Sequence, residues 1–175
     1  MSKPISSSVA VPLAHALLRI LVVVNWLGGA ALLTLLVVLP NEQWIMSAFK
    51  LAPSPAATRL VLGLRAVAVL GLIAVPLHYV VLKRLLALVG TVRAGDPFVA
   101  ANAHHLQRIA WTLLALQLLS LVIGAIGRFI STPAHPVQLK AGFSSSGWLA
   151  VLLSFLLARV FAEGADLRKA RERTG

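Results

Sequence analysis

Four long apolar runs without Asp, Glu, Lys or Arg dominate the pattern of this chain. They cover residues 20–41, 66–82, 109–127 and 141–158. A helix needs about 20 apolar residues to cross the hydrocarbon core of a bilayer, which is about 30 Å thick, because each residue advances about 1.5 Å. The second run extends back to Leu60 if Arg65 is allowed inside it. The pattern therefore predicts four transmembrane helices.

The expected fold is all-α: a polytopic membrane protein whose four transmembrane helices form an up-down bundle in a single domain, residues 1–175. The expected spans are residues 16–40, 57–82, 107–129 and 144–163. An apolar stripe continues at helical spacing beyond the second span, through Leu85, Val89 and Val92. We therefore expect helices two and three to extend into the cytoplasm and to form an elbow over residues 83–106.

The segments outside the spans are expected to be short. Residues 1–12 have no periodicity and are interpreted as a loose lead-in, and residues 42–51 as a short helix in the outer interface. The first span lacks the small-residue cleavage pattern of a secretory signal, so we expect it to be retained. Ser54-Pro55 and Ser144–Ser146 have the residue types that begin helices. Residues 164–175 form a basic tail.

Charge sets the expected orientation. Apolar residues make up 59% of the chain and charged residues 12%, and the net charge is +11. Of the 16 Lys and Arg, eleven lie in the N-terminal segment, the elbow, the tail and the ends of the spans that adjoin them, and five lie on the other side. Because cytoplasmic loops carry the excess of Lys and Arg, both termini are expected in the cytoplasm. This charge suits anionic lipid headgroups better than direct contact with nucleic acid.

Polar and small residues inside the spans predict helix contacts. Asn25 is expected to bond across to another helix, which typically contributes about 1 kcal/mol or less. Two pairs of small residues at a spacing of four, Ala30 with Thr34 and Ser120 with Gly124, are expected to let a neighbour approach closely.

The chain offers no catalytic constellation, and we expect that it is not an enzyme. It has no cysteine, and its five acidic residues form no pair suited to hydrolysis. The candidates for binding a haem or a metal are His15, His78, His104 and His105, all near the expected cytoplasmic face. Ligating histidines normally have carboxylate or carbonyl partners behind them, and none is evident here. We therefore assign no cofactor and no metal.

The elbow contains the one motif-like polar segment. Gly95 is a natural end for helix two, and Asp96 and Pro97 suit a cap and a first helical turn. Phe98 is expected to pack back on helix two, and Asn102 to cap a second helix start. One continuous helix and a broken one both remain open.

These residues carry a resemblance. Gly95-Asp96-Pro97-Phe98 with Asn102 and residues 106–109, followed by residues 161–168 after the last span, resembles the bacterial four-helix membrane proteins known as domain of unknown function 2975. The resemblance covers most of the chain and implies a four-span inner-membrane protein, often encoded beside a small helix-turn-helix regulator. It implies no catalytic residues. The end of this chain, residues 171–175, departs from the Leu-Thr-Val-like tail of many relatives.

We expect a membrane anchor or regulatory partner that binds a cytoplasmic protein, with a small helix-turn-helix regulator as the candidate. The alternatives are a small-solute transporter or toxin-immunity protein, with Asn25, Arg65 and Gln117 facing a polar path, and a haem- or quinone-binding membrane subunit. Self-association into a homo-oligomer stays open. The residues proposed to contact a partner are Gly95, Asp96, Pro97, Phe98, Asn102, Arg108, Glu163, Gly164, Leu167 and Arg168.

Overall fold

The computed structural model describes residues 7–38, 55–94, 99–131 and 141–174. This part of the chain forms four long helices and no strand: α1 (Ser7–Val38), α3 (Pro55–Arg93), α4 (Ala100–Ile130) and α5 (Ser145–Thr174). Each is long and apolar enough to cross a membrane, which confirms the predicted all-α, four-span class. The expected interfacial helix over residues 42–51 and the residues Gly95 to Phe98 lie outside the described residues.

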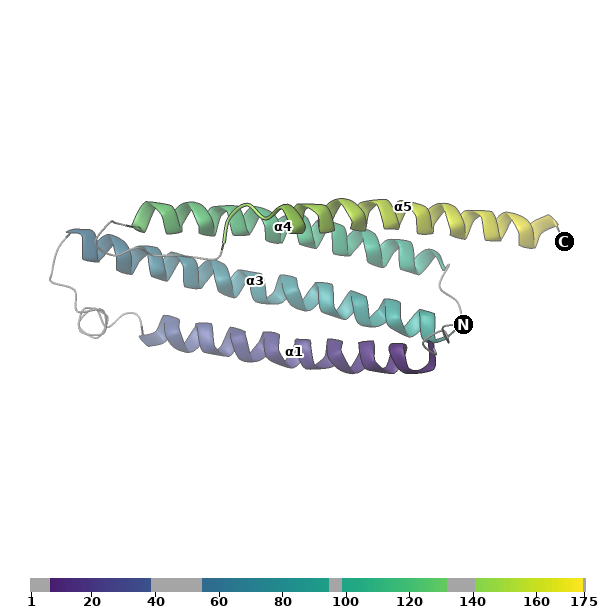
Figure 1. Ribbon diagram of the computed structural model, residues 1–175, viewed down its shortest axis with the longest axis horizontal. Helices are drawn as coiled ribbons and strands as arrows, with labels where there is room; N and C mark the ends of the chain where they lie inside the picture. Colours follow the sequence, from purple (N-terminus) through teal and green to yellow (C-terminus); the bar gives the residue numbers. More distant parts are fainter. Residues whose placement is uncertain (1–6, 39–54, 95–98, 132–140, 175) are drawn as a thin grey trace, which may run out of the picture.

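The helices follow one another in space in the order of the chain (Figure 1). Helix α1 packs on α3, α3 on α4, and α4 on α5, each pair antiparallel. No other pair of these helices is in contact in the described part of the chain. The up-down arrangement is therefore open between its first and last helices.

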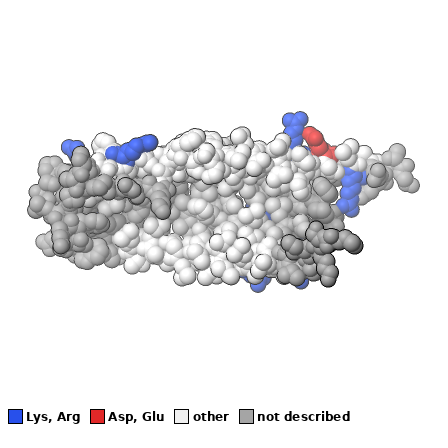
Figure 2. Space-filling view, viewed as in Figure 1, with Lys and Arg blue, Asp and Glu red and all other residues white. Residues whose placement is uncertain are grey.

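The surface of the middle of the molecule is apolar. Large hydrophobic side chains are exposed along all four helices, among them Leu27, Ile73, Val122 and Leu152. In Figure 2 the Lys, Arg, Asp and Glu side chains that show on this face lie toward the two ends, with uncharged residues between. In water, this apolar surface would have to be covered by partner proteins on all sides. In a membrane, lipid tails cover it without a partner. The chain is a multi-pass membrane protein.

All four helices exceed the roughly 20 residues that cross a membrane, and α3 and α5 continue past the ends predicted for their spans. Helix α3 has 39 residues and extends about 58 Å at 1.5 Å per residue, about twice the hydrocarbon thickness. It begins at Pro55, as predicted, and continues through Lys83 and Arg84 to Arg93, as its apolar stripe indicates. Helix α5 continues through the basic tail to Thr174.

The expected lead-in is wrong for residues 7–12, which belong to α1. Pro12 lies inside this helix. A proline near a helix start removes only one backbone hydrogen bond, and the neighbouring Ala10, Leu13 and Ala14 favour helix. The segment therefore continues the first span in the N-terminal direction.

The contact between α1 and α3 is built around Val75. The side-chain amide Nδ2 of Asn25 donates to the carbonyl oxygen of Val75 at 3.1 Å, which confirms the predicted bond across helices. Gly29 lies against the Val75 side chain, and Trp26 and Tyr79 pack with ring centroids 5.7 Å apart. The predicted contact at Ala30 and Thr34 is wrong: both are exposed. Thr34 uses its hydroxyl on the Ala30 carbonyl of its own helix, at 2.9 Å.

Helix α4 contacts the segment that leads into α5. Ser120 Oγ accepts from the Gly142 backbone N–H at 3.1 Å, and Gly124 lies against the Gly142 backbone. The predicted Ser120–Gly124 pair is thus a contact surface, although its partner is a loop. Gly142 has a φ of +129°, which favours glycine. Ser144 Oγ accepts from the Gly147 N–H at 3.2 Å and caps α5, as its residue type predicts.

Candidate functional site

The end of α3, the start of α4, the start of α1 and the end of α5 lie at the same end of the molecule, which we call the elbow end (Figure 1). Asn102, in the first turn of α4, is fully buried there. Its Nδ2 donates to Thr91 Oγ1 on α3 at 2.8 Å, and Thr91 Oγ1 lies 2.8 Å from the Leu88 carbonyl oxygen. Since the hydroxyl both accepts and donates, it links Asn102 to the α3 backbone.

This geometry corrects the prediction that Asn102 caps a second helix start. Helix α4 is continuous from Ala100, and Val99 before it is extended, with φ −94° and ψ 144°. Helix α4 therefore begins after the extended Val99 and includes Asn102 in its first turn. The Asn102 side chain faces α3, and the Thr91 hydroxyl there is a better-placed partner than the backbone of its own first turn.

A second hydrogen bond joins the same two helices one turn closer to the apolar run of residues 109–127. Arg84 Nη1 donates to His105 Nδ1 at 3.0 Å. Only a neutral ring with an unprotonated Nδ1 can accept this bond. The pKa of His105 is lowered, first by burial, then by the positive charge of Arg84, and then by His104. These causes all favour the neutral ring that the bond requires.

The candidate histidines are not brought to a single site. His105 faces α3, whereas its neighbour His104 lines a groove between α4 and α5. His78 Nδ1 lies 2.9 Å from the Ala74 carbonyl oxygen of its own helix, and His15 is half-buried on α1. Among the described residues no three His, Asp or Glu side chains lie close enough together to hold a metal ion.

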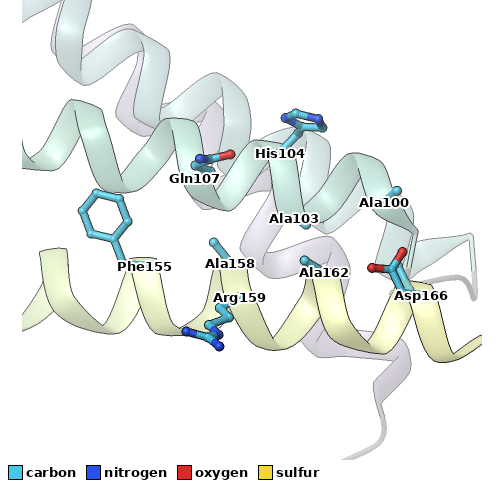
Figure 3. A pocket seen from close by; sticks show the side chains of 10 residues that line it. Ala100, Ala103, His104, Gln107, Phe155, Ala158, Arg159, Ala162 and Asp166 are labelled. Carbon is cyan, nitrogen blue, oxygen red and sulfur yellow. The ribbon is translucent and has the colours of Figure 1, made fainter.

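A groove lies between α4 and α5 at the elbow end (Figure 3). It has a volume of about 360 Å³. Alanines from both helices lie between α4 and α5. Gln107 and Asp166 also line the groove, whereas the His104 ring and the Arg159 guanidinium extend to opposite sides of the helix pair. Phe155 lies at the end nearer the apolar runs and packs edge-on against Trp111, with centroids 5.3 Å apart. The full lining is Ala100, Ala103, His104, Gln107, Phe155, Ala158, Arg159, Ala162, Ala165 and Asp166.

A second hollow lies where α1 and α5 fail to meet. It has a volume of about 450 Å³, and all four helices contribute to it. Its lining residues are Val11, Ala14, Leu88, Val89, Val92, Asn102, Leu106, Leu157 and Phe161. The surface inside it is apolar throughout. The buried Asn102 thus holds together one wall of an apolar pocket.

The other proposed contact residues are accessible. Arg108, Glu163, Leu167 and Arg168 are exposed, and Gly164 is half-buried. Glu163 Oε1 accepts from Arg159 Nε at 3.0 Å, and the two residues are four apart on α5. Gly95, Asp96, Pro97 and Phe98 lie outside the described residues. The motif therefore divides into a buried tie, Asn102, and an exposed surface.

Two residues of the transporter alternative have structural roles. Asn25 bonds to α3, and Gln117 Nε2 donates to the Ser144 carbonyl oxygen at 3.2 Å, at the start of α5. Arg65 is half-buried.

The groove between α4 and α5 was not predicted, although its alanines recur at helical spacing, at residues 100 and 103 and at 158, 162 and 165. This spacing on two successive spans was the signal available in the sequence.

The fold and the elbow end define a class: an all-α, multi-pass membrane protein with four long helices in an open up-down layer. The family described as "Protein of unknown function (DUF2975)" matches residues 39–174. The chain belongs to this family, in agreement with the resemblance of its motifs. No curated protein and no solved structure matches the chain.

Proposed function

We propose that this protein is a non-enzymatic anchor or regulatory partner in the bacterial inner membrane, and that it binds a cytoplasmic protein at the elbow end. Both termini lie in the cytoplasm in this proposal, because eleven of the 16 Lys and Arg belong to the segments on that side. A small helix-turn-helix regulator is the proposed partner, since the family resemblance implies such a neighbour.

The observation that carries this proposal is that apolar side chains follow the first Lys and Arg residues after the apolar runs of α3 and α5. Leu88, Val89 and Val92 follow Lys83 and Arg84 on α3, yet they line the 450 Å³ apolar pocket. On α5, Leu167 follows Arg159 and is 73% exposed. Lipid tails do not reach past the headgroups, and exposed apolar patches outside the bilayer are characteristic of protein-binding surfaces. This surface suits the apolar face of a partner helix.

The two hydrogen bonds between α3 and α4 suit a binding surface that can change between two conformations. The bond from Asn102 to Thr91 and the bond from Arg84 to His105 hold α3 against α4 beside the pocket. A ligand, or a change in the membrane, that alters the packing of α3 on α4 would alter the shape of the pocket. The affinity of the protein for the regulator would then change. The two states would need to differ in their contacts with the partner for such a switch to work.

Site-specific photocrosslinking in cells tests this proposal. A photoreactive amino acid at Leu167 or at Arg93, both exposed at the elbow end, is expected to give an adduct with a soluble helix-turn-helix protein. The same amino acid at Leu152, which is 64% exposed in the middle of the last apolar run, is the matched control and is expected to give lipid adducts. Adducts are identified by mass spectrometry. Only lipid and self adducts from Leu167 and Arg93 would contradict the proposal.

A further inference from the structure

A positive charge and a neutral histidine meet between α3 and α4 at the elbow end. Arg84 Nη1 donates to His105 Nδ1 at 3.0 Å, and both side chains are half-buried. In the described part of the chain Arg84 has no carboxylate partner. Arginine keeps its charge at physiological pH, so only His105 can titrate in this pair. The hydrogen bond therefore exists in one protonation state of His105 alone.

The surroundings of His105 do not favour a second positive charge. The titratable and charged residues described on α3 and α4 from the bond outward, on α5 beside α4, and on the elbow half of α1, which packs on α3 and not on α4, are Lys83, Arg84, Arg93, His104, Arg108, Arg159, Glu163, Asp166, Arg168, His15 and Arg19. Burial lowers the pKa of His105 most, and the charges of Arg84 and then His104 lower it further. No carboxylate opposes these effects.

The bond between Arg84 and His105 adjoins the apolar pocket. His105 directly precedes Leu106, and Arg84 lies one turn before Leu88, and both leucines line the 450 Å³ pocket. Because α3 and α4 each form part of the pocket wall, a change in their separation at the level of this bond changes the shape of the pocket.

We propose that the contact between Arg84 and His105 is a proton-sensitive switch, in which protonation of His105 separates α3 from α4 at the elbow end and reshapes the apolar pocket. A protonated imidazole has no lone pair with which to accept from Arg84, and two positive charges then lie side by side. The helix movement does not depend on a partner. Its effect on the cytoplasmic regulator rests on the proposed function.

The pH range follows from the direction of the pKa shift. Histidine has an ordinary pKa of about 6.5, and the pKa of His105 in the fold is lower. The stabilisation from the neutral ring is therefore complete above about pH 6.5. It is lost as the pH falls below that value and through the lower pKa of the folded state. The switch thus responds to acidification of the compartment that the elbow end faces.

Distances between two spin labels test the movement on the purified full chain in lipid nanodiscs, without any partner. The chain has no cysteine, so the labels are attached through Gly90→Cys on α3 and Ala101→Cys on α4, two exposed positions at the elbow end. A second population at longer distance is expected at about pH 5 and not at about pH 7.5, on either side of the ordinary histidine pKa. The same distances at both pH values would overturn the proposal.

Three substitutions in the labelled chain assign the response to this contact. His105→Gln keeps an acceptor for Arg84 but cannot titrate, and Arg84→Gln keeps a donor but carries no charge. Both are expected to remove the longer population at about pH 5. His104→Gln is the matched control, because His104 lines the groove on the side of α5, and it is expected to keep the response. A full response in His105→Gln or in Arg84→Gln would overturn the proposal.

Photocrosslinking from Leu167 then tests the effect on the partner. Membrane vesicles with the elbow end exposed to buffer are supplied with the regulator that crosslinking identifies in cells. The yield is expected to fall by about two- to tenfold from about pH 7.5 to about pH 5, and to fall less in His105→Gln. No crosslink at either pH together with pH-dependent distances would contradict the proposed function and support the switch. Equal crosslinking at both pH values would overturn the control of the partner by the proton.

Discussion

Asn102→Ala is expected to lower the free energy of unfolding by about 1–3 kcal/mol. The Asn102 side chain is fully buried, and its amide donates to Thr91 across the elbow. Removing it leaves a cavity beside the apolar pocket and takes away the donor to the Thr91 hydroxyl. Thermal or denaturant unfolding of the purified protein in detergent measures the effect. The same variant is expected to weaken crosslinking from Leu167, because α3 and α4 no longer meet in one arrangement.

The partner residue provides the control for this prediction. Thr91→Val keeps the shape of the side chain and removes the hydroxyl. If the two residues act through their hydrogen bond, the effects of Thr91→Val and Asn102→Ala are less than additive in the double variant. Fully additive effects, or an Asn102→Ala protein as stable as the unmodified chain, would show that this bond does not hold the elbow.

Gly124→Ala is expected to destabilise the protein by about 1–3 kcal/mol, the typical effect of overpacking a tight contact. A Cβ at this position would lie 2.6 Å from the Gly142 Cα and 2.8 Å from the Ala141 carbonyl oxygen. These are backbone atoms, which cannot rotate away as the tip of a side chain can. The segment that leads into α5 would have to move, and with it the start of that helix. The shift in the unfolding midpoint reports the change.

A matched substitution separates the contact from the helix propensity. Gly90→Ala adds the same methyl group within α3, where the new Cβ has no atom within 4 Å apart from its two neighbours in the chain and the nearby backbone of its own helix. Since alanine favours helix over glycine by about 0.5–1 kcal/mol, this variant is expected to be as stable as the unmodified chain or slightly more so. Equal behaviour of Gly124→Ala and Gly90→Ala would contradict the close contact between α4 and the loop.

Features that depend on one segment of the chain were predictable from the sequence. The uncharged runs give the four spans because hydrocarbon excludes charge over a fixed thickness. The stripe through Leu85, Val89 and Val92 gives the continuation of α3, and Ser144 gives the start of α5. Asn25 could be expected to bond to another helix because an amide surrounded by apolar residues needs a partner.

Features that depend on which faces meet were not predictable in the same way. Every face of a membrane helix is apolar, so periodicity does not show which face meets a neighbour. This is why the contact lies at Gly29 and not at Ala30 and Thr34, one position along the same helix. From the sequence alone Asn102 is a plausible helix cap, because only the fold places Thr91 opposite it across the elbow. The groove likewise needs α4 and α5 side by side before its alanines and charges form one surface.

The proposed function requires that the elbow end faces the cytoplasm, because only then can it meet a cytoplasmic protein. The chain has no cysteine, so single cysteines can be placed without background. Leu167 at the elbow end is 73% exposed, and Phe129 at the opposite end is 76% exposed. A membrane-impermeant maleimide applied to spheroplasts, before and after lysis, measures which side each occupies. We expect Phe129→Cys to be labelled before lysis and Leu167→Cys only after it. Labelling of Leu167→Cys before lysis would contradict the proposed orientation and the proposed function.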